Sequence, residues 1–97
     1  MIASHAIASE TSNQVNRILK DINWKPDKTI INDCGTVFFI WENPGKYTDI
    51  ECTNKGDVLC GMTDFKDINI AYELQLNISS FLKFKKEYEN FANQRFF

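Results

Sequence analysis

The stretch that most constrains the fold runs from residue 35 to residue 52 and combines two β-strand patterns with a turn. Residues 36–42 are apolar on both alternating faces, which predicts a strand in the middle of a sheet or one covered on both sides. Residues 43–46 read Asn-Pro-Gly-Lys, a turn in which proline presets φ and glycine tolerates a positive φ. Residues 47–53 alternate with one largely polar face, so the stretch predicts an antiparallel hairpin.

Two further strands are predicted after this hairpin. Residues 58–62 follow a second hairpin turn, in which Gly56 is expected to take the left-handed position. Residues 68–76 alternate strictly between apolar and polar side chains, which predicts a fourth strand. A helix is the alternative for 68–76, because the segment contains good helix formers. Residues 29–31 are a candidate for an additional short strand.

The two ends of the chain have helical patterns. Residues 9–22 repeat apolar side chains at intervals of three and four, and Pro26 predicts that this helix ends near Asn23. Residues 1–8 either extend this helix or fray. Residues 79–94 predict a second helix, capped by Asn77 or Ser79. Its aromatic stripe consists of Phe81, Phe84, Tyr88 and Phe91. The candidate N-caps of the first helix are Ser9, Thr11 and Ser12.

These elements predict one α+β domain spanning residues 1–97. The expected fold is an antiparallel four-stranded meander with the order α-β-β-β-β-α and both helices packed on one face.

Acidic side chains are concentrated in the middle of the chain. Residues 42–73 hold seven acidic and three basic side chains, and the whole chain has a net charge of −2. Solvated strand faces and turns are the ordinary explanation, and an acidic patch that meets a basic partner is the alternative. The net charge argues against a general nucleic-acid binder, which normally carries a basic surface.

Few residues of the chain are suited to catalysis or metal binding. His5 is the only histidine, and Cys34, Cys52 and Cys60 have no C-x-x-C spacing. The three cysteines are interpreted as small buried hydrophobic residues. No metal, cofactor or enzymatic activity is expected. The odd number of cysteines predicts a reduced, cytoplasmic protein. The N-terminus lacks a basic start and a long apolar run, so neither a secretory signal nor a membrane span is expected.

Aromatic residues make up 13% of the chain, which is generous for 97 residues. Either some rings are exposed and bind a partner, or the core is simply rich in aromatics. A nucleic-acid site on the C-terminal helix, where cations stand among rings, is a weaker alternative. Its cations would be Lys83, Lys85, Lys86 and Arg95.

A spaced pattern runs through the central hairpin. It has an isoleucine, a glycine, alternating apolar residues that end in Trp-Glu, a strand with Tyr and Ile-Glu, and a turn glycine. The residues are Ile31, Gly35, Val37, Phe39, Trp41, Glu42, Tyr47, Ile50, Glu51 and Gly56. This pattern, within residues 26–62, resembles a loose group of small bacterial and prophage-encoded proteins. Genes of that group often lie near toxin–antitoxin or phage-defence loci, so the resemblance implies a binding role.

Together these features predict a non-enzymatic protein that binds and blocks another protein, as a phage or mobile-element anti-defence (anti-CRISPR-like) inhibitor would. The expected partner is a defence nuclease complex. An antitoxin that neutralises a toxin and a small nucleic-acid-binding regulator are the alternatives, and a homodimer stays open. The predicted partner-binding residues are Glu42, Tyr47, Asp49, Glu51, Asp57, Phe96 and Phe97.

Overall fold

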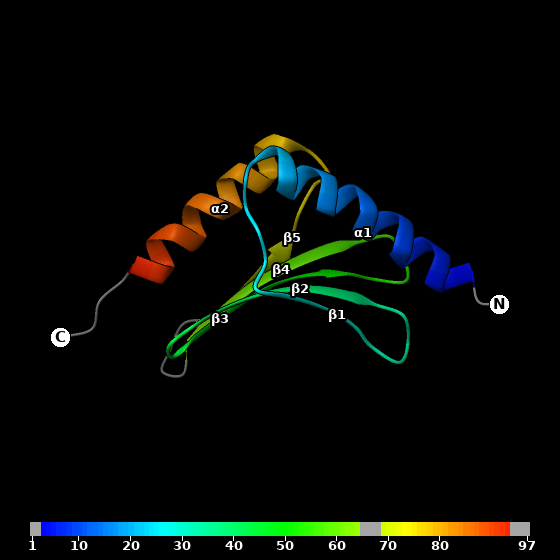
Figure 1. Cartoon of the computed structure of the whole chain (residues 1–97), viewed down its shortest axis with the longest axis horizontal. Helices are drawn as coiled ribbons and strands as arrows, with labels where there is room; N and C mark the ends of the chain where they lie inside the picture. The colour runs from blue at the N-terminus through cyan, green and yellow to red at the C-terminus, as the bar shows by residue number, and fades with distance from the viewer. Residues whose placement is uncertain (1–2, 65–68, 94–97) are drawn as a thin grey trace.

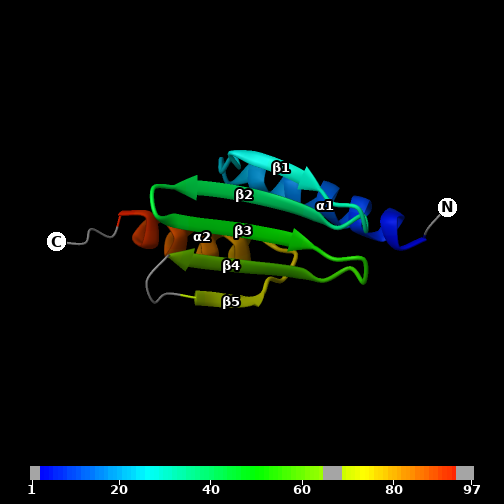
Figure 2. The ribbon, with the colours of Figure 1, turned by 90° about the horizontal axis from the view of Figure 1, so that it is seen from below.

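The computed structural model describes residues 3–64 and 69–93. Within them, five antiparallel strands form one sheet in the order β1-β2-β3-β4-β5, and two helices lie on one face of it (Figures 1 and 2). The α+β class and the meander are confirmed, whereas the expected number of four strands is wrong by one. The elements are α1 Ala3–Asp21, β1 Lys28–Ile31, β2 Val37–Asn43, β3 Lys46–Cys52, β4 Val58–Asp64, β5 Asn69–Glu73 and α2 Ile78–Asn93.

The additional strand is β1, which pairs with β2 at the edge of the sheet. It has only four residues, and all four are exposed. A strand this short shows little alternation, which is why residues 29–31 were only a candidate for it.

Helix α1 begins at Ala3, so the helix extends into residues 1–8, and the proposed N-caps Ser9, Thr11 and Ser12 are wrong. All three lie inside the helix, where the Ser12 hydroxyl donates to the Ser9 carbonyl at 2.8 Å. The predicted end near Asn23 is confirmed. Asn23 has φ of 56°, and the Trp24 N–H donates to the Leu19 carbonyl at 2.9 Å, the pattern of a left-handed helix cap.

Helix α2 is capped by Asn77, one of the two predicted caps. The Asn77 side-chain oxygen accepts a hydrogen bond from the Ser80 N–H at 2.7 Å. Within the described residues, neither helix carries an apolar stretch long enough to cross a membrane.

The two hairpin turns form as predicted around glycines in the left-handed region, with φ of 74° at Gly45 and 87° at Gly56. Lys46 was expected in the first turn, but it is the first residue of β3 and only 7% exposed. Its side chain lies on the helix side of the sheet, where Nζ donates to the Phe91 carbonyl at 2.5 Å. The last turn of α2 contains no basic residue of its own.

Strand β5 confirms the strand interpretation of residues 68–76 over the helical one, although the strand ends at Glu73. Beyond that point the Leu74 N–H still donates to the Val58 carbonyl at 2.7 Å, and the Leu74 side chain is buried. Leu76 is exposed, so the predicted apolar face does not continue to its last member. Residue 68 lies outside the described residues.

The core lies between the helices and the sheet and is rich in aromatic rings. Trp24 stacks on Trp41 with ring centroids 4.2 Å apart, and Tyr88 of α2 lies against both rings. The Trp41 indole N–H donates to the Lys25 carbonyl at 2.9 Å, which ties the segment between α1 and β1 to the sheet. The predicted aromatic stripe of α2 faces this core, with Phe81, Phe84 and Phe91 buried.

Candidate functional site

The sheet face opposite the helices is covered by no element of the described residues (Figures 1 and 2). On β3 and β4 the buried residues alternate with more exposed ones, and on β2 the same alternation holds except at Ile40, which is also buried. The members of the core cluster on these strands face the helices. The intervening residues, with their cross-strand partners on β1 and β5, form what we call the open face. It consists of Lys28, Ile30, Phe38, Ile40, Glu42, Tyr47, Asp49, Glu51, Leu59, Gly61, Thr63, Asn69, Ala71 and Glu73.

The charges of the open face are mostly acidic. Four of its side chains are carboxylates, and one, Lys28, is cationic. The carboxylates are Glu42, Asp49, Glu51 and Glu73. The predicted acidic middle of the chain therefore contributes four side chains to one surface.

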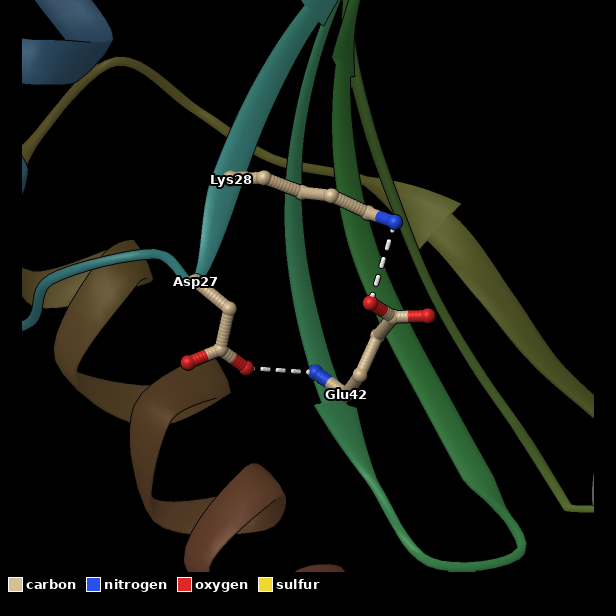
Figure 3. Close-up of polar contacts among 3 residues, drawn as sticks. All are labelled: Asp27, Lys28 and Glu42. Carbon is tan, nitrogen blue, oxygen red and sulfur yellow. Dashed lines mark hydrogen bonds and ion pairs between the residues drawn. The ribbon is translucent and has the colours of Figure 1, made fainter.

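Glu42 lies at one end of the open face and is held by β1 and the residue before it. The Lys28 ammonium is 3.0 Å from a Glu42 carboxylate oxygen, and the Asp27 carboxylate accepts a hydrogen bond from the Glu42 N–H at 2.7 Å (Figure 3). Both side chains of the ion pair are about half exposed, so its contribution to stability is small, about 0–1 kcal/mol. The pair orients Glu42, while its second carboxylate oxygen has no contact with Asp27 or Lys28 in Figure 3.

Asp49 lies at the centre of the open face, between Ile40 of β2 and Gly61 of β4 in the strand register. Burial raises the pKa of the Asp49 carboxyl group. A hydrogen bond from Tyr47 lowers this pKa in part, and the negative charge of Glu51 raises it further. Burial and the neighbouring Asp49 also raise the pKa of the Tyr47 hydroxyl. An ionised Asp49 is therefore less well solvated than a free carboxylate, and a cation placed against it would relieve that cost.

A shallow hollow of about 260 Å³ lies beside Asp49. Gly61 and Ala71 lie opposite each other and both line the hollow, and their small size leaves space between the neighbouring side chains. A Cβ atom at position 61 would lie 3.2 Å from an Asp49 carboxylate oxygen, so glycine also leaves room for that side chain. Tyr47, Glu51 and Leu59 are among the residues of its wall.

Apolar side chains lie among these carboxylates. Phe38 is half-buried, and Ile30 and Leu59 are exposed. Ile40 is only 4% exposed even though no helix covers it, because its neighbours on this face flank it closely. Strand β2 was predicted to be central or covered on both sides, and it is central with its second face open.

Four of the seven predicted partner-binding residues come together on the open face, namely Glu42, Tyr47, Asp49 and Glu51. Asp57 is exposed but lies in the turn between β3 and β4, away from these four residues along the strands. Phe96 and Phe97 lie outside the described residues.

The premise that many rings are exposed is largely wrong for the described residues. Trp24 and Trp41 are buried, as are three rings of α2, so the aromatic-rich core is the interpretation that holds for them. Tyr88 is half-buried against the same core, whereas Tyr72 of β5 is exposed although its ring packs edge-on against Phe84. Phe38 and Tyr47 are the two rings on the open face, and both are half-buried.

All three cysteines are free, and two of them are buried. Burial raises the pKa of Cys52 and of Cys60 to about 12, so both thiols stay protonated near neutral pH. Cys34 was expected to be buried but is exposed, in a turn where its thiol donates to the Asn32 side-chain oxygen at 3.0 Å. Among the described side chains, no three from His, Cys, Asp and Glu are arranged to hold a metal ion.

The C-terminal helix offers its cations without the rings that a single-strand binder would need. Lys83 and Lys86 are exposed, but Lys85 donates to the Ile22 carbonyl at 3.0 Å. The rings beside them face the core and cannot stack on bases. Arg95 lies outside the described residues.

Sequence reasoning missed the contribution of Lys28, Phe38, Ile40 and Gly61 to this surface. The alternation of β2 placed Phe38 and Ile40 together on one face, which is the signal that could have identified them. The hairpin turn is a second signal, because it pairs this face of β2 with the polar residues of β3 and so indicates that the helices cover the other face.

No family model, curated protein or solved structure matches the chain. The resemblance of residues 26–62 to prophage-encoded proteins therefore stays a prediction, and the functional argument depends on the surface itself.

Proposed function

We propose that this protein acts without catalysis, by binding another protein through the open face and blocking it. The observation that carries the proposal is a sheet face that no described element covers and that combines four carboxylates with half-buried and exposed apolar side chains. Monomeric proteins rarely leave such a mixed apolar surface without a use, and interfaces typically have apolar centres with charged rims.

The charge of the open face favours a partner with a basic surface. The open face carries four carboxylates and one ammonium group, so it attracts the Lys and Arg side chains of a partner. This attraction raises the rate at which the two proteins associate. The hollow beside Asp49 is large enough to take the end of such a side chain, and the raised pKa of Asp49 means that a cation there would stabilise the ionised carboxylate.

A basic surface that is blocked by a small acidic protein is characteristic of proteins that act on nucleic acids, since these need cations to hold phosphates. An anti-defence inhibitor of a nuclease complex fits this description, and an antitoxin against a nucleic-acid-cleaving toxin fits it equally well. Both act where nucleic acids are processed, which agrees with a cytoplasmic location. A nucleic-acid-binding role for α2 has less support, because the rings of α2 are buried.

Affinity capture with matched charge variants tests the proposal. The protein is immobilised and exposed to an extract of its source cells and to a panel of purified defence nuclease complexes and toxins. The same capture is repeated with Asp49→Lys/Glu51→Lys on the open face and with Glu10→Lys/Glu89→Lys on the two helices. Both double variants change the net charge by the same amount, and all four positions are half-buried or exposed.

We expect a basic protein that is retained by the wild type and by the helix variant and is lost with the open-face variant. A partner that is retained equally by both variants would overturn the proposal, as would the absence of any partner across the panel and the extract.

A further inference from the structure

Strand β1 leaves one side of its backbone without a strand partner at the edge of the sheet (Figure 2). The Asn32 N–H donates to the Thr36 carbonyl at 3.1 Å, which fixes the alternation of hydrogen-bonded positions along the β1–β2 pair. Because these positions alternate in an antiparallel ladder, the N–H and C=O groups of Ile30 point to β2. The N–H and C=O groups of Thr29 and Ile31 therefore point outward, away from the sheet.

The side chain of Ile31 is the second notable feature of this edge. It is 71% exposed, more than any other large apolar side chain of the described residues. It lies on the helix side of the sheet, as does Thr29, because both are cross-strand partners of β2 residues that face the helices.

Two grooves open between α1 and β1, with volumes of about 410 and 550 Å³. Thr29 of β1 and Asn16 of α1 line both of them, so the grooves meet at these two residues, and Ile31 also lines the smaller groove. The edge thus offers a projecting apolar side chain at position 31 and a space beside position 29, two residues earlier on the same face.

We propose that two copies of this chain pair through β1, in antiparallel register about a two-fold axis that passes between the two Ile30 residues. In this register Thr29 of each copy lies opposite Ile31 of the other, and their outward backbone groups form about four hydrogen bonds. Ile31 of each copy then enters the space beside Thr29 of the other copy. The two five-stranded sheets join into one.

The register explains why the occupant is a second copy and not an unrelated strand. A two-fold axis places residue 29 of each copy opposite residue 31 of the other. The same contact, between the Ile31 side chain of one copy and the space beside Thr29 of the other, is therefore made twice. The two Ile30 side chains, each 41% exposed, meet on the open face beside Phe38. Lys28 lies opposite Asn32 of the second copy, so the two lysines do not face each other.

This pairing is independent of the partner proposed for the open face, because it uses the backbone edge and the helix side of the sheet. It leaves Asp49 and Glu51 uncovered and places two open faces side by side.

Disulfide trapping tests the register directly. The two Ile30 residues form a non-hydrogen-bonded pair, whose Cα atoms lie about 4.5 Å apart, within the range that disulfides span. The two Thr29 residues are diagonal to each other, at about 7–8 Å or more. Ile30→Cys and Thr29→Cys are each made in a Cys34→Ser background, because Cys34 is the exposed native thiol while Cys52 and Cys60 are buried.

We expect Ile30→Cys to form a covalent dimer under mild oxidation at least about tenfold faster than Thr29→Cys. The wild type should sediment as a dimer of its 11.3 kDa chain, and Ile31→Lys should sediment as a folded monomer with an unchanged far-UV circular dichroism spectrum. Equal cross-linking of the two cysteine variants would overturn the proposal, as would a wild type that stays monomeric at about 100 µM, where weak specific dimers are populated.

Discussion

Replacing Lys46 by Met removes a buried cation from the end of α2 while keeping a flexible side chain of similar length. Lys46 Nζ donates to the Phe91 carbonyl at 2.5 Å, lies 3.5 Å from the Ala92 carbonyl and stands 5.3 Å from the Phe91 ring centroid. It also lies opposite Asp64 in the β3–β4 register, and Asp64 is buried as well. Lys46→Met should therefore destabilise the fold.

The magnitude follows from these contacts. A hydrogen bond to a charged group contributes about 1.5–3 kcal/mol, a cation at a helix C-terminus about 0.3–2 kcal/mol and a cation–π contact about 0.5–1 kcal/mol. These contributions overlap, and the free-energy cost of removing the lysine charge from water offsets part of them. We expect a net loss of about 2 kcal/mol in the free energy of unfolding, which lowers Tm by roughly 8–16 °C for a chain of this size.

Urea denaturation followed by far-UV circular dichroism measures this loss. Lys83→Met is the matched control, because Lys83 is an exposed lysine of α2. The control should differ from the wild type by less than about 0.5 kcal/mol. If Lys46→Met is as stable as Lys83→Met, the cation does not stabilise the end of α2, and the reasoning is refuted.

Two further predictions concern cysteine accessibility and the cost of the Asp49 charge. In the native state at neutral pH, a thiol-specific disulfide reagent should label Cys34 rapidly, because its thiol is exposed. Cys52 and Cys60 should be labelled only as the chain unfolds, because both are buried and have pKa values of about 12. Rapid labelling of more than one thiol would contradict this prediction. The raised pKa of Asp49 means that its contribution to stability is present below its unfolded pKa of 3.8 and is lost as pH rises through the folded value. Asp49→Asn should therefore gain stability relative to the wild type as pH rises from about 3 to about 7, measured by urea denaturation. A stability difference between the two proteins that stays constant, or that shifts toward the wild type as pH rises, would be the contrary result.

The sequence predicted the elements that have a clear period and missed those that depend on distant contacts. Strict alternation identified β5, and the interval of three and four identified the buried face of α1. Strand β1 is too short to show a period and exists because β2 offers a backbone to pair with. The start of α1 was misplaced because three hydroxyl residues inside the helix look like caps when only the sequence is known.

The candidate site was predicted in part for a similar reason. The polar alternation of β3 correctly placed Tyr47, Asp49 and Glu51 on one face. Lys46 belongs to the same strand, but its turn context gave no indication that it reaches the end of α2, 45 residues away in the chain. The exposure of individual rings could not be predicted either, because it depends on how the helices pack against the sheet, as the stacking of Trp24 on Trp41 shows.

The most direct test of the open face as a docking surface is the Kd of the captured partner for the two double charge variants, measured by calorimetry. Our account predicts that Asp49→Lys/Glu51→Lys weakens binding about 100-fold, or about 2.8 kcal/mol, while Glu10→Lys/Glu89→Lys changes it less than about threefold. Equal affinities for the two variants would show that the partner binds elsewhere on the molecule.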